Sequence, residues 1–534
     1  MIVESDSSQN RSLHGWRAAV LTLTALAAFA RTLQGGFVWD DLLHIVHDPA
    51  VREIVDWPHY LTAFGSVANA GHPGPYYRPL FQMSLAADYQ LWGLNPFGFH
   101  LTNLVLHTLT ALLVCAVGLQ LGLHLAPALG AALLFAVHPV QTESVAYISA
   151  RADLLCTLFL LCVAALWLAA LERAGPNRWW RLGMALAAYA LALLSKELAL
   201  AGPALMLVYA AVRTDSRRRA RLWAALPFVA LAALYLAWRW TDWAATAATD
   251  SADWVRELPR LSVIFAHDLR LLVFPFRLNS MYIIPVPRGW AAPEVGASLV
   301  LAVVYAAAVV TAWRRAPAIA LALLWIVIGL LPVLNPIYTA RLSSPMAEQF
   351  LYAPSIGFAW LVAGGFERAR VRLGLGWNAA RALAGVGLVV CAVSVWKRTA
   401  DWKDDLTVFT RMSQTAPKSP MAFNHLGSIY RGRGQLGRAI RVFERAVGLN
   451  PLDADIRLNL GLAYQESGRL DQAVAELRRS EALRPGQPEA QARIRQILLQ
   501  RAVLPGQPSA ADSAPVAHAR APANSTESAP RGMP

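Results

Sequence analysis

The chain has 534 residues, of which 56% are hydrophobic and only 15% charged, and its mean hydropathy is +0.39. A soluble domain of this size carries more charge, so the composition predicts a polytopic membrane protein. The net charge is +14, but the arginines gather in short loops between apolar runs and form no basic stripe with interleaved aromatics, which argues against a nucleic-acid partner. The four cysteines all lie in apolar runs without metal-ligand spacing, so we expect no disulfide framework.

Two adjacent carboxylates follow the first apolar run, 17–35, and form the stretch around which the chain is organised. Asp40 and Asp41 sit among aromatic residues in the sequence FVWDDLLH. We expect the run before them to stay as a membrane span, since no small-residue cleavage site follows it. The acidic pair then lies at the membrane surface, where it can act on a lipid-linked substrate. The alternative is a solvated turn or a cap for the next helix.

The first outer loop, 36–98, is rich in proline and aromatic residues. This composition is typical of short amphipathic helices on the membrane surface. Within it, the step Tyr77-Arg78 could present a guanidinium to a phosphate, or it could be an interfacial aromatic anchor.

Three polar residues share one face of the second predicted span. His100, Asn103 and His107 are spaced three and four apart. Polar residues on a membrane helix usually point into the protein or a cavity. Interhelical hydrogen bonding is the alternative to a functional role. We favour a role for His100, because it lies at the outer end, level with the acidic pair.

Further ionisable residues follow between the third and fourth predicted spans. His138 and Glu143 lie in the string HPVQTES, and Arg151 and Asp153 come shortly after. The two carboxylates fall at the same predicted depth as the acidic pair, although Arg151 and Asp153 could simply pair with each other.

A lysine and a glutamate interrupt the apolar sequence between the fifth and sixth predicted spans. Ionisable residues such as Lys196 and Glu197 within membrane segments usually mark a functional site. The compact ammonium group of Lys196 suits a phosphate ligand. The alternative is a salt bridge that stitches the turn. A later outer loop supplies Arg341 as another phosphate candidate, and Tyr352 is expected one turn into the tenth span.

The arginine distribution predicts the topology of the chain. We expect eleven spans at 17–35, 99–121, 125–138, 152–172, 178–194, 198–213, 221–240, 293–313, 317–334, 348–366 and 378–397. With eleven crossings the arginine-rich loops fall on one side, so the N-terminal segment 1–15 is predicted to be cytoplasmic. The acidic pair and everything after 397 then lie on the opposite side. This holds if 257–276, which contains charged residues, is an interfacial or re-entrant helix.

The last third of the chain is repetitive and more polar. Pro417, Pro451 and Pro485 recur at 34-residue intervals, with matching small and apolar residues between them. This is the tetratricopeptide signature. We expect repeats over 398–500 and a disordered Pro-, Ala- and Ser-rich tail over 501–534.

Several of these motifs occur together in the order seen in one family. The motifs are FVWDD at 37–41, YRP at 77–79, GFHLTNLVLH at 98–107, HPVQTESVA at 138–146, RADLL at 151–155, SKE at 195–197 and LYAPS at 351–355. The ordered set resembles the transmembrane and tetratricopeptide-repeat O-mannosyltransferases and their bacterial relatives. That family belongs to the GT-C glycosyltransferases, which use polyprenyl-phosphate sugars as donors. In that superfamily an acidic residue of the first outer loop acts at the acceptor, and the resemblance carries this role onto Asp40 or Asp41.

We therefore expect an all-α protein with a GT-C-like transmembrane domain over 16–397 followed by a tetratricopeptide solenoid. The resemblance implies an enzyme of the bacterial inner membrane that moves a mannose-like hexose from a polyprenyl-phosphate donor lipid to a protein or glycan hydroxyl. The transfer takes place on the extracytoplasmic face, and periplasmic repeats present an acceptor protein or peptide. The alternatives are a membrane-anchored repeat scaffold without catalysis, and a transporter, which would place its charges at the midplane.

The predicted site divides into three groups of residues. Asp40, ahead of Asp41, is the expected general base. The candidates for holding the lipid phosphate are Arg78, His100, Lys196 and Arg341. The expected supporting polar residues are Tyr77, Asn103, His107, His138, Glu143, Arg151, Asp153, Glu197 and Tyr352. No metal ligand is assigned and no cofactor is expected with certainty, with a divalent metal left open.

Overall fold

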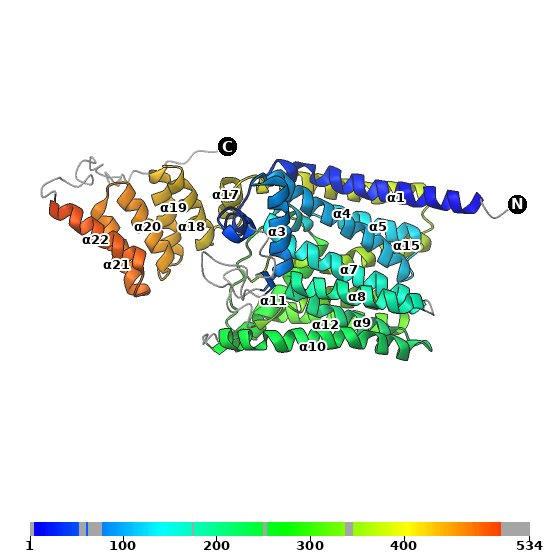
Figure 1. The fold of residues 1–534 in the computed structure, drawn as a ribbon. Helices are drawn as coiled ribbons and strands as arrows, with labels where there is room; N and C mark the ends of the chain where they lie inside the picture. Colours follow the sequence, from blue (N-terminus) through cyan, green and yellow to red (C-terminus); the bar gives the residue numbers. More distant parts are fainter. Residues whose placement is uncertain are drawn as a thin grey trace, which may run out of the picture. The chain divides into compact units, whose positions relative to one another are not determined.

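The computed structural model describes residues 5–52, 60–61, 77–172, 176–248, 254–336 and 345–503. Within these ranges the regular secondary structure is helical, apart from one isolated bridge between Tyr282 and Met346 (Figure 1). The chain divides into two compact units, Met1–Lys418 and Ser419–Pro534, which are described separately.

The N-terminal unit is built from long apolar helices joined by short helical turns. Its α-helices are α1 Ser5–Phe29, α3 Pro79–Trp92, α4 Pro96–Gln120, α5 Leu125–Val137, α6 Gln141–Ala146, α7 Arg151–Glu172, α8 Pro176–Ser195, α9 Gly202–Val212, α10 Arg218–Ala248, α11 Trp254–Val273, α12 Pro293–Arg315, α13 Pro317–Leu330, α15 Pro354–Arg372, α16 Trp377–Arg398 and α17 Asp405–Thr415. Its short turns are η1 Ala30–Gln34, η2 Leu42–Val46, η3 Pro49–Arg52, η5 Ile148–Ala150, η6 Glu197–Ala201, η7 Glu348–Leu351 and η8 Thr399–Trp402.

Five of the described helices are long and apolar enough to cross a membrane. They are Pro96–Gln120, Ile148–Glu172, Arg218–Trp240, Pro293–Arg315 and Trp377–Trp402, with shorter apolar helices at Leu125–Val137, Glu197–Val212 and Pro317–Leu330. The helices differ in how much of the most apolar window is buried inside the unit: 61% for α7 but 17% for α12 and 11% for α16. The apolar faces that α12 and α16 leave uncovered suit contact with lipid. The count of eleven spans stays a prediction.

Helix starts follow local sequence rules. Proline occupies the first turn of α4, α9, α12, α13 and α15, where its missing N–H costs no hydrogen bond. The Asn95 side chain caps α4 by accepting a hydrogen bond from the backbone N–H of Phe97 (3.1 Å).

The segment 35–41, which carries Asp40 and Asp41, is called the acidic loop. The first turns of α4 and α7 meet it at one end of the N-terminal unit, which we call the site end. His100 of α4 lies 3.4 Å from the carbonyl oxygen of Gly36, at the start of the loop. Arg151, the first residue of α7, donates to the carbonyl oxygen of Phe99 (2.9 Å). The loop is closed from the other side by a hydrogen bond from the Gly36 N–H to the carbonyl oxygen of Lys403 (2.8 Å).

The C-terminal unit is a stack of helix pairs. Its helices are α18 Pro420–Gly432, α19 Leu436–Leu449, α20 Ala454–Glu466, α21 Leu470–Leu483 and α22 Pro488–Val503. A Cβ atom at Gly427 would lie 2.6 Å from the Phe443 ring, and one at Gly461 would lie 2.8 Å from Leu477. Only glycine lets the two helices of each pair approach this closely, which explains the recurring Leu-Gly step.

The division between the units falls after Lys418, twenty-one residues later than the expected end of the membrane domain at 397. Helix α17 belongs to the N-terminal unit because it packs against the acidic loop. Asp405 at its start accepts a hydrogen bond from the Trp39 backbone N–H (2.6 Å), and Phe409 meets the Trp39 ring edge-on. The expected tail over 501–534 lies outside the described residues beyond Val503.

Candidate active site

The two adjacent aspartates have different surroundings. Asp41 is fully buried, and its carboxylate accepts hydrogen bonds from the Val38 N–H (3.1 Å), the Ser149 N–H (2.8 Å) and the Ser149 hydroxyl (2.6 Å). Asp40 is only half-buried, and its carboxylate accepts one hydrogen bond, from the Tyr147 hydroxyl (2.7 Å). Asp41 therefore ties the loop to the start of α7, and Asp40 is the one with a face toward solvent.

Burial raises the pKa of the Asp41 carboxyl to about 7, against the lowering effect of its three hydrogen-bond donors. The nearby charge of Asp40 acts in the same direction as burial but more weakly. A pKa near 7 suits a general base as well as a structural group. The full burial of Asp41 decides between the two roles, because an acceptor hydroxyl cannot reach a carboxylate that is enclosed by the protein.

The backbone at Trp39 turns the loop so that the two side chains diverge. Its φ is +55°, in the left-handed region that a bulky residue rarely occupies. The ring of Trp39 stacks on Tyr147 with centroids 5.8 Å apart, and Tyr147 stacks on Trp402 at 5.3 Å. The aromatic stack therefore holds the Tyr147 hydroxyl at a fixed position beside Asp40.

Two cations at the site end are each paired with a carboxylate from a distant part of the chain. Arg78, which precedes α3, pairs with Glu197 at 3.0 Å, and both side chains are partly exposed (17% and 25%). Lys196 pairs with Asp153 of α7 through both carboxylate oxygens, at 2.6 and 2.7 Å. The sequence left open whether Lys196 pairs with Glu197 and Arg151 with Asp153, and the structure shows neither pair.

His44 lies between the acidic loop and Arg78. Its Nδ1 is 3.2 Å from the Ser149 hydroxyl oxygen, and its ring meets Phe81 edge-on. Burial is the main cause that lowers the pKa of His44, while Asp40 raises it and Arg78 lowers it further. Both charges therefore lie close enough to act on one imidazole, which places Asp40 and Arg78 in the same small region.

Arg151 is a buried clamp at the start of α7 and does not face solvent. Its guanidinium pairs with Asp88 of α3 at 2.6 Å and donates to Asn103 (2.8 Å) and to the backbone of Ser84 (3.1 Å). Asn103 in turn donates to the carbonyl oxygen of Tyr147 (3.3 Å). The clamp thus joins α3, α4 and α7 directly beneath the aromatic stack.

The two histidines on the same face of α4 are also buried. His107 bridges helices, with Nδ1 2.9 Å from the Tyr352 hydroxyl and Nε2 3.1 Å from the Ala136 carbonyl oxygen. This is the interhelical hydrogen bonding that the sequence offered as the alternative. His100 is 1% exposed and faces the backbone of Gly35 and Gly36, so it supports the loop from beneath. Tyr352 lies two residues before α15 and not one turn within it.

A second buried ionic cluster lies next to α6. Glu143 accepts from the backbone N–H of Glu348 (3.1 Å), and Glu348 accepts from Arg398 (2.7 Å) and from the Tyr282 hydroxyl (2.7 Å). Burial, and then the charge of Glu348, raise the pKa of Glu143 well above its ordinary value. The cluster holds the η7 turn against α6 and α16.

The remaining predicted residues have structural contacts or lie outside the described part of the chain. The Nε2 atom of His138 donates a hydrogen bond to the Leu272 carbonyl oxygen (3.0 Å). The Tyr77 hydroxyl donates to the Leu61 carbonyl oxygen (2.7 Å). Arg341 lies outside the described residues. Within the described ranges, no group of three or more His, Cys, Asp or Glu residues could hold a metal ion.

Sequence reasoning missed the residues that orient the pair. Tyr147 and Ser149 were not selected, although they stand between α6 and α7, where the chain returns to the acidic loop. Asp88 was also missed; an acidic residue in the otherwise apolar α3 was the available signal. The partners of Arg78 and Lys196 could not be identified, because ion pairs between residues 43 and 119 positions apart leave no local pattern.

The fold and site define a class: an all-α protein with helices of membrane-spanning length, an acidic loop and two paired cations at one end of these helices, and C-terminal helical repeats. The tetratricopeptide repeat family matches residues 425–488, which confirms the repeats.

Comparison of the whole chain finds relatives among the protein O-mannosyltransferases, as the motif order predicted. The chain is 27% identical to the Caenorhabditis elegans protein O-mannosyl-transferase F38B6.6 over 81% of this chain and 62% of that protein. It is 25% identical to Drosophila melanogaster Tmtc3 over 87% of this chain and 58% of the relative. A shorter segment of 164 residues, 27% of this chain and 22% of the relative, is 40% identical to human TMTC4. The chain thus spans less than two thirds of the length of these relatives.

Among solved structures, the crystal structure of ArnT from Cupriavidus metallidurans bound to undecaprenyl phosphate aligns with 91% of this chain and 78% of its own, at 14% identity. Its TM-score of 0.37 is too low to establish a common fold.

Proposed function

We propose that this chain is a GT-C-type membrane glycosyltransferase that moves a mannose-like hexose from a polyprenyl-phosphate donor to a protein or glycan hydroxyl. Its similarity to O-mannosyltransferases over more than four fifths of the chain supports this reaction class. The observation that carries the proposal is the division of roles in the acidic pair. Asp41 accepts three hydrogen bonds inside the protein, whereas Asp40 is half-buried and accepts one, from Tyr147.

Asp40 is the proposed general base. The acceptor hydroxyl gives its proton to the free oxygen of Asp40 as the hydroxyl oxygen attacks the anomeric carbon of the donor. The bond between that carbon and the phosphate oxygen breaks, and the polyprenyl phosphate leaves with the bonding electrons. The Tyr147 hydroxyl, fixed by its stack with Trp39 and Trp402, orients the carboxylate for this transfer.

Arg78 and Lys196 are the proposed phosphate ligands. Negative charge grows on the leaving phosphate in the transition state, so fixed cations stabilise it most at that point. Glu197 and Asp153 hold the two cations in place before the donor binds, which lowers the cost of ordering them. The donor phosphate would then share these cations with the carboxylates. We assign His100 to support of the loop and not to the phosphate, because it is buried under Gly36.

We further propose that the acidic loop and the repeats face the periplasm of a bacterial inner membrane, as the arginine distribution predicts. The repeats would present an acceptor protein or peptide, and the polyprenyl tail would lie among the membrane helices. A topology reporter fused after Glu466 tests this arrangement: a reporter that is active only in the cytoplasm should be silent there, and activity would contradict it.

The experiment that tests the function is transfer from a radiolabelled polyprenyl-phosphate mannose to an acceptor peptide by the purified full chain. The proposal expects label in the peptide, and no label with the variant Asp40→Asn. Absence of transfer from a panel of polyprenyl-phosphate hexoses, by a protein with a normal melting curve, would favour a membrane-anchored repeat scaffold.

A further inference from the structure

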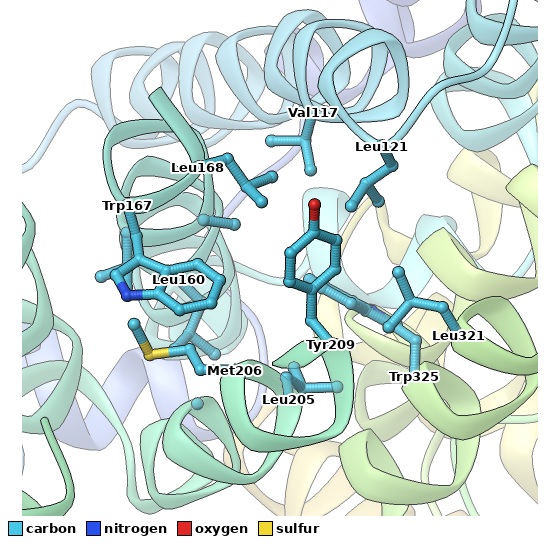
Figure 2. A pocket seen from close by; sticks show the side chains of 13 residues that line it. Val117, Leu121, Leu160, Trp167, Leu168, Leu205, Met206, Tyr209, Leu321 and Trp325 are labelled. Atoms are coloured by element: carbon cyan, nitrogen blue, oxygen red, sulfur yellow. The ribbon is translucent and has the colours of Figure 1, made fainter. Parts of the chain in front are cut away.

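The end of the N-terminal unit opposite the site end contains two adjoining apolar pockets. The first is lined from α4, α7, α9 and α13 and holds a narrow cavity of about 40 Å³ that is open on one side (Figure 2). The second holds a cavity of about 30 Å³ and shares Leu121 and Leu321 with the first. Leu121 is 21 residues beyond His100, so the pockets lie about 30 Å along α4 from the acidic loop.

The walls of the first pocket are suited to a hydrocarbon chain. Figure 2 shows Tyr209 of α9 standing between Trp167 of α7 and Trp325 of α13, with Val117 and Leu121 beyond its hydroxyl. The lining is otherwise aliphatic or aromatic, with Gly202 at the start of α9. An apolar pocket of this kind stays free of ordered water and accepts an apolar ligand.

The mouths of both pockets carry guanidinium groups. Arg213 and Arg221 lie over the Tyr209 ring, 5.8 and 5.7 Å from its centroid, and Arg213 donates to the Leu121 carbonyl oxygen (3.2 Å). Arg368 lines the second pocket. A Cβ atom at Gly122 would lie 3.7 Å from the Arg213 guanidinium, so this arginine borders the turn after α4.

Only some of the arginines at this end are paired with carboxylates. Arg221 is paired with Asp215 at 2.6 Å. In the part of the chain that the structure describes, Arg213 and Arg368 are exposed and form no ion pair, and each donates only to a backbone carbonyl oxygen. Three more exposed arginines follow in sequence: Arg217, Arg218 and Arg219. Two apolar slots that share a wall and open beside free guanidinium groups match an anionic lipid with two chains.

We propose that these pockets hold the two acyl chains of an anionic glycerophospholipid whose phosphate lies against Arg213 and Arg368. This site is separate from the proposed donor site and lies at the other end of the membrane helices. A bound lipid would fill the pocket that separates the C-terminal end of α4 from α9 and α13.

The test uses the purified full chain and a phosphatidylglycerol with a photoreactive group near the end of one acyl chain. After irradiation, cross-links should map to the pocket-lining parts of α7, α9 or α13. Phosphatidylcholine with the same chain should label these helices less. Because each arginine near an anionic headgroup contributes roughly 5-fold in affinity, the double variant Arg213→Gln/Arg368→Gln should lower labelling by roughly 5- to 25-fold.

Two further variants keep the test decisive. Arg314 and Arg315 are exposed arginines at the end of α12 that line neither pocket, so Arg314→Gln/Arg315→Gln is the matched charge control and should label as wild type. Ala164 lines the first pocket, so Ala164→Phe should fill it and lower labelling without changing charge.

Three results would overturn the proposal. Equal labelling by the two lipids would show that the arginines do not select an anionic headgroup. Labelling spread over the exposed faces of α12 and α16, and unaffected by Ala164→Phe, would indicate ordinary bilayer contact. Displacement by stoichiometric polyprenyl phosphate but not by unlabelled phosphatidylglycerol would assign the pockets to the donor tail. Inorganic phosphate alone should not compete, since it has no chain to bury.

Discussion

Replacing Asp41 should separate its structural role from the base role proposed for Asp40. In Asp41→Ala the Val38 N–H, which is fully buried, loses its acceptor, and so does the Ser149 N–H. An unsatisfied buried donor costs about 1–3 kcal/mol. Asp41→Asn removes the same charge but keeps an acceptor for the two hydrogen bonds from Ser149, so we expect the free energy of unfolding of Asp41→Ala to be about 1–3 kcal/mol lower than that of Asp41→Asn.

The variant Asp41→Asn should be much milder. Its amide oxygen can still accept from Ser149, while its NH₂ group faces the Val38 N–H and loses that bond. The free energy lost with that hydrogen bond is offset, because burial of the charged Asp41 carboxylate is itself unfavourable. Its pKa of about 7, against an ordinary 3.8, corresponds to roughly 4 kcal/mol against the charged form. Asp41→Asn should therefore fold with near wild-type stability and keep at least about a tenth of the transfer rate.

The assay is turnover of a labelled donor together with thermal and chemical unfolding in detergent, for both variants. If Asp41→Asn melts like wild type yet abolishes transfer, while Asp40→Asn transfers normally, the assignment of the base is reversed. If Asp41→Ala unfolds like Asp41→Asn, the hydrogen bonds from Ser149 do not hold the loop.

Three further predictions follow from the same geometry. The folded state binds the Asp41 proton more tightly than the unfolded state, so the contribution of Asp41 to stability should be greatest below about pH 4 and fall as the pH rises toward 7. The difference in stability between wild type and Asp41→Asn, measured against pH, isolates this contribution. A difference that does not change with pH would contradict the burial argument. Lys196→Ala should raise the KM for the donor with an intact fold if Lys196 binds phosphate, whereas wild-type turnover at low donor concentration would make Lys196 structural. Tyr147→Phe keeps the aromatic stack but removes the hydrogen bond to Asp40, which is worth about 1–1.5 kcal/mol, so kcat should fall roughly 10-fold with KM unchanged. A change in KM alone would refute a positioning role for Tyr147.

The sequence predicted the features that depend on local pattern. The 34-residue period predicted the repeats, and the close contacts of Gly427 and Gly461 explain why that period requires a small residue. Spacing three and four apart correctly placed His100, Asn103 and His107 on one buried face of α4.

The sequence could not predict which polar residues form their hydrogen bonds and ion pairs inside the protein. Asp40 and Asp41 are adjacent and chemically identical, and only the fold shows that Ser149, more than a hundred residues away, binds one of them. Arg151 looked like a site residue beside Asp153, yet it is a buried clamp whose acidic partner is Asp88. Burial and long-range pairing depend on how helices pack, and no short segment encodes that packing.

The measurement that tests the account most directly is the transfer rate of Asp40→Asn, taken with its melting curve. Asparagine is nearly isosteric and can still accept the hydrogen bond from Tyr147, but it cannot take a proton from the acceptor. A general base contributes about 10²–10⁴-fold to the rate, so transfer should fall by that factor while the melting midpoint stays close to wild type. A variant that melts normally and transfers sugar at the full rate would contradict the role given to Asp40.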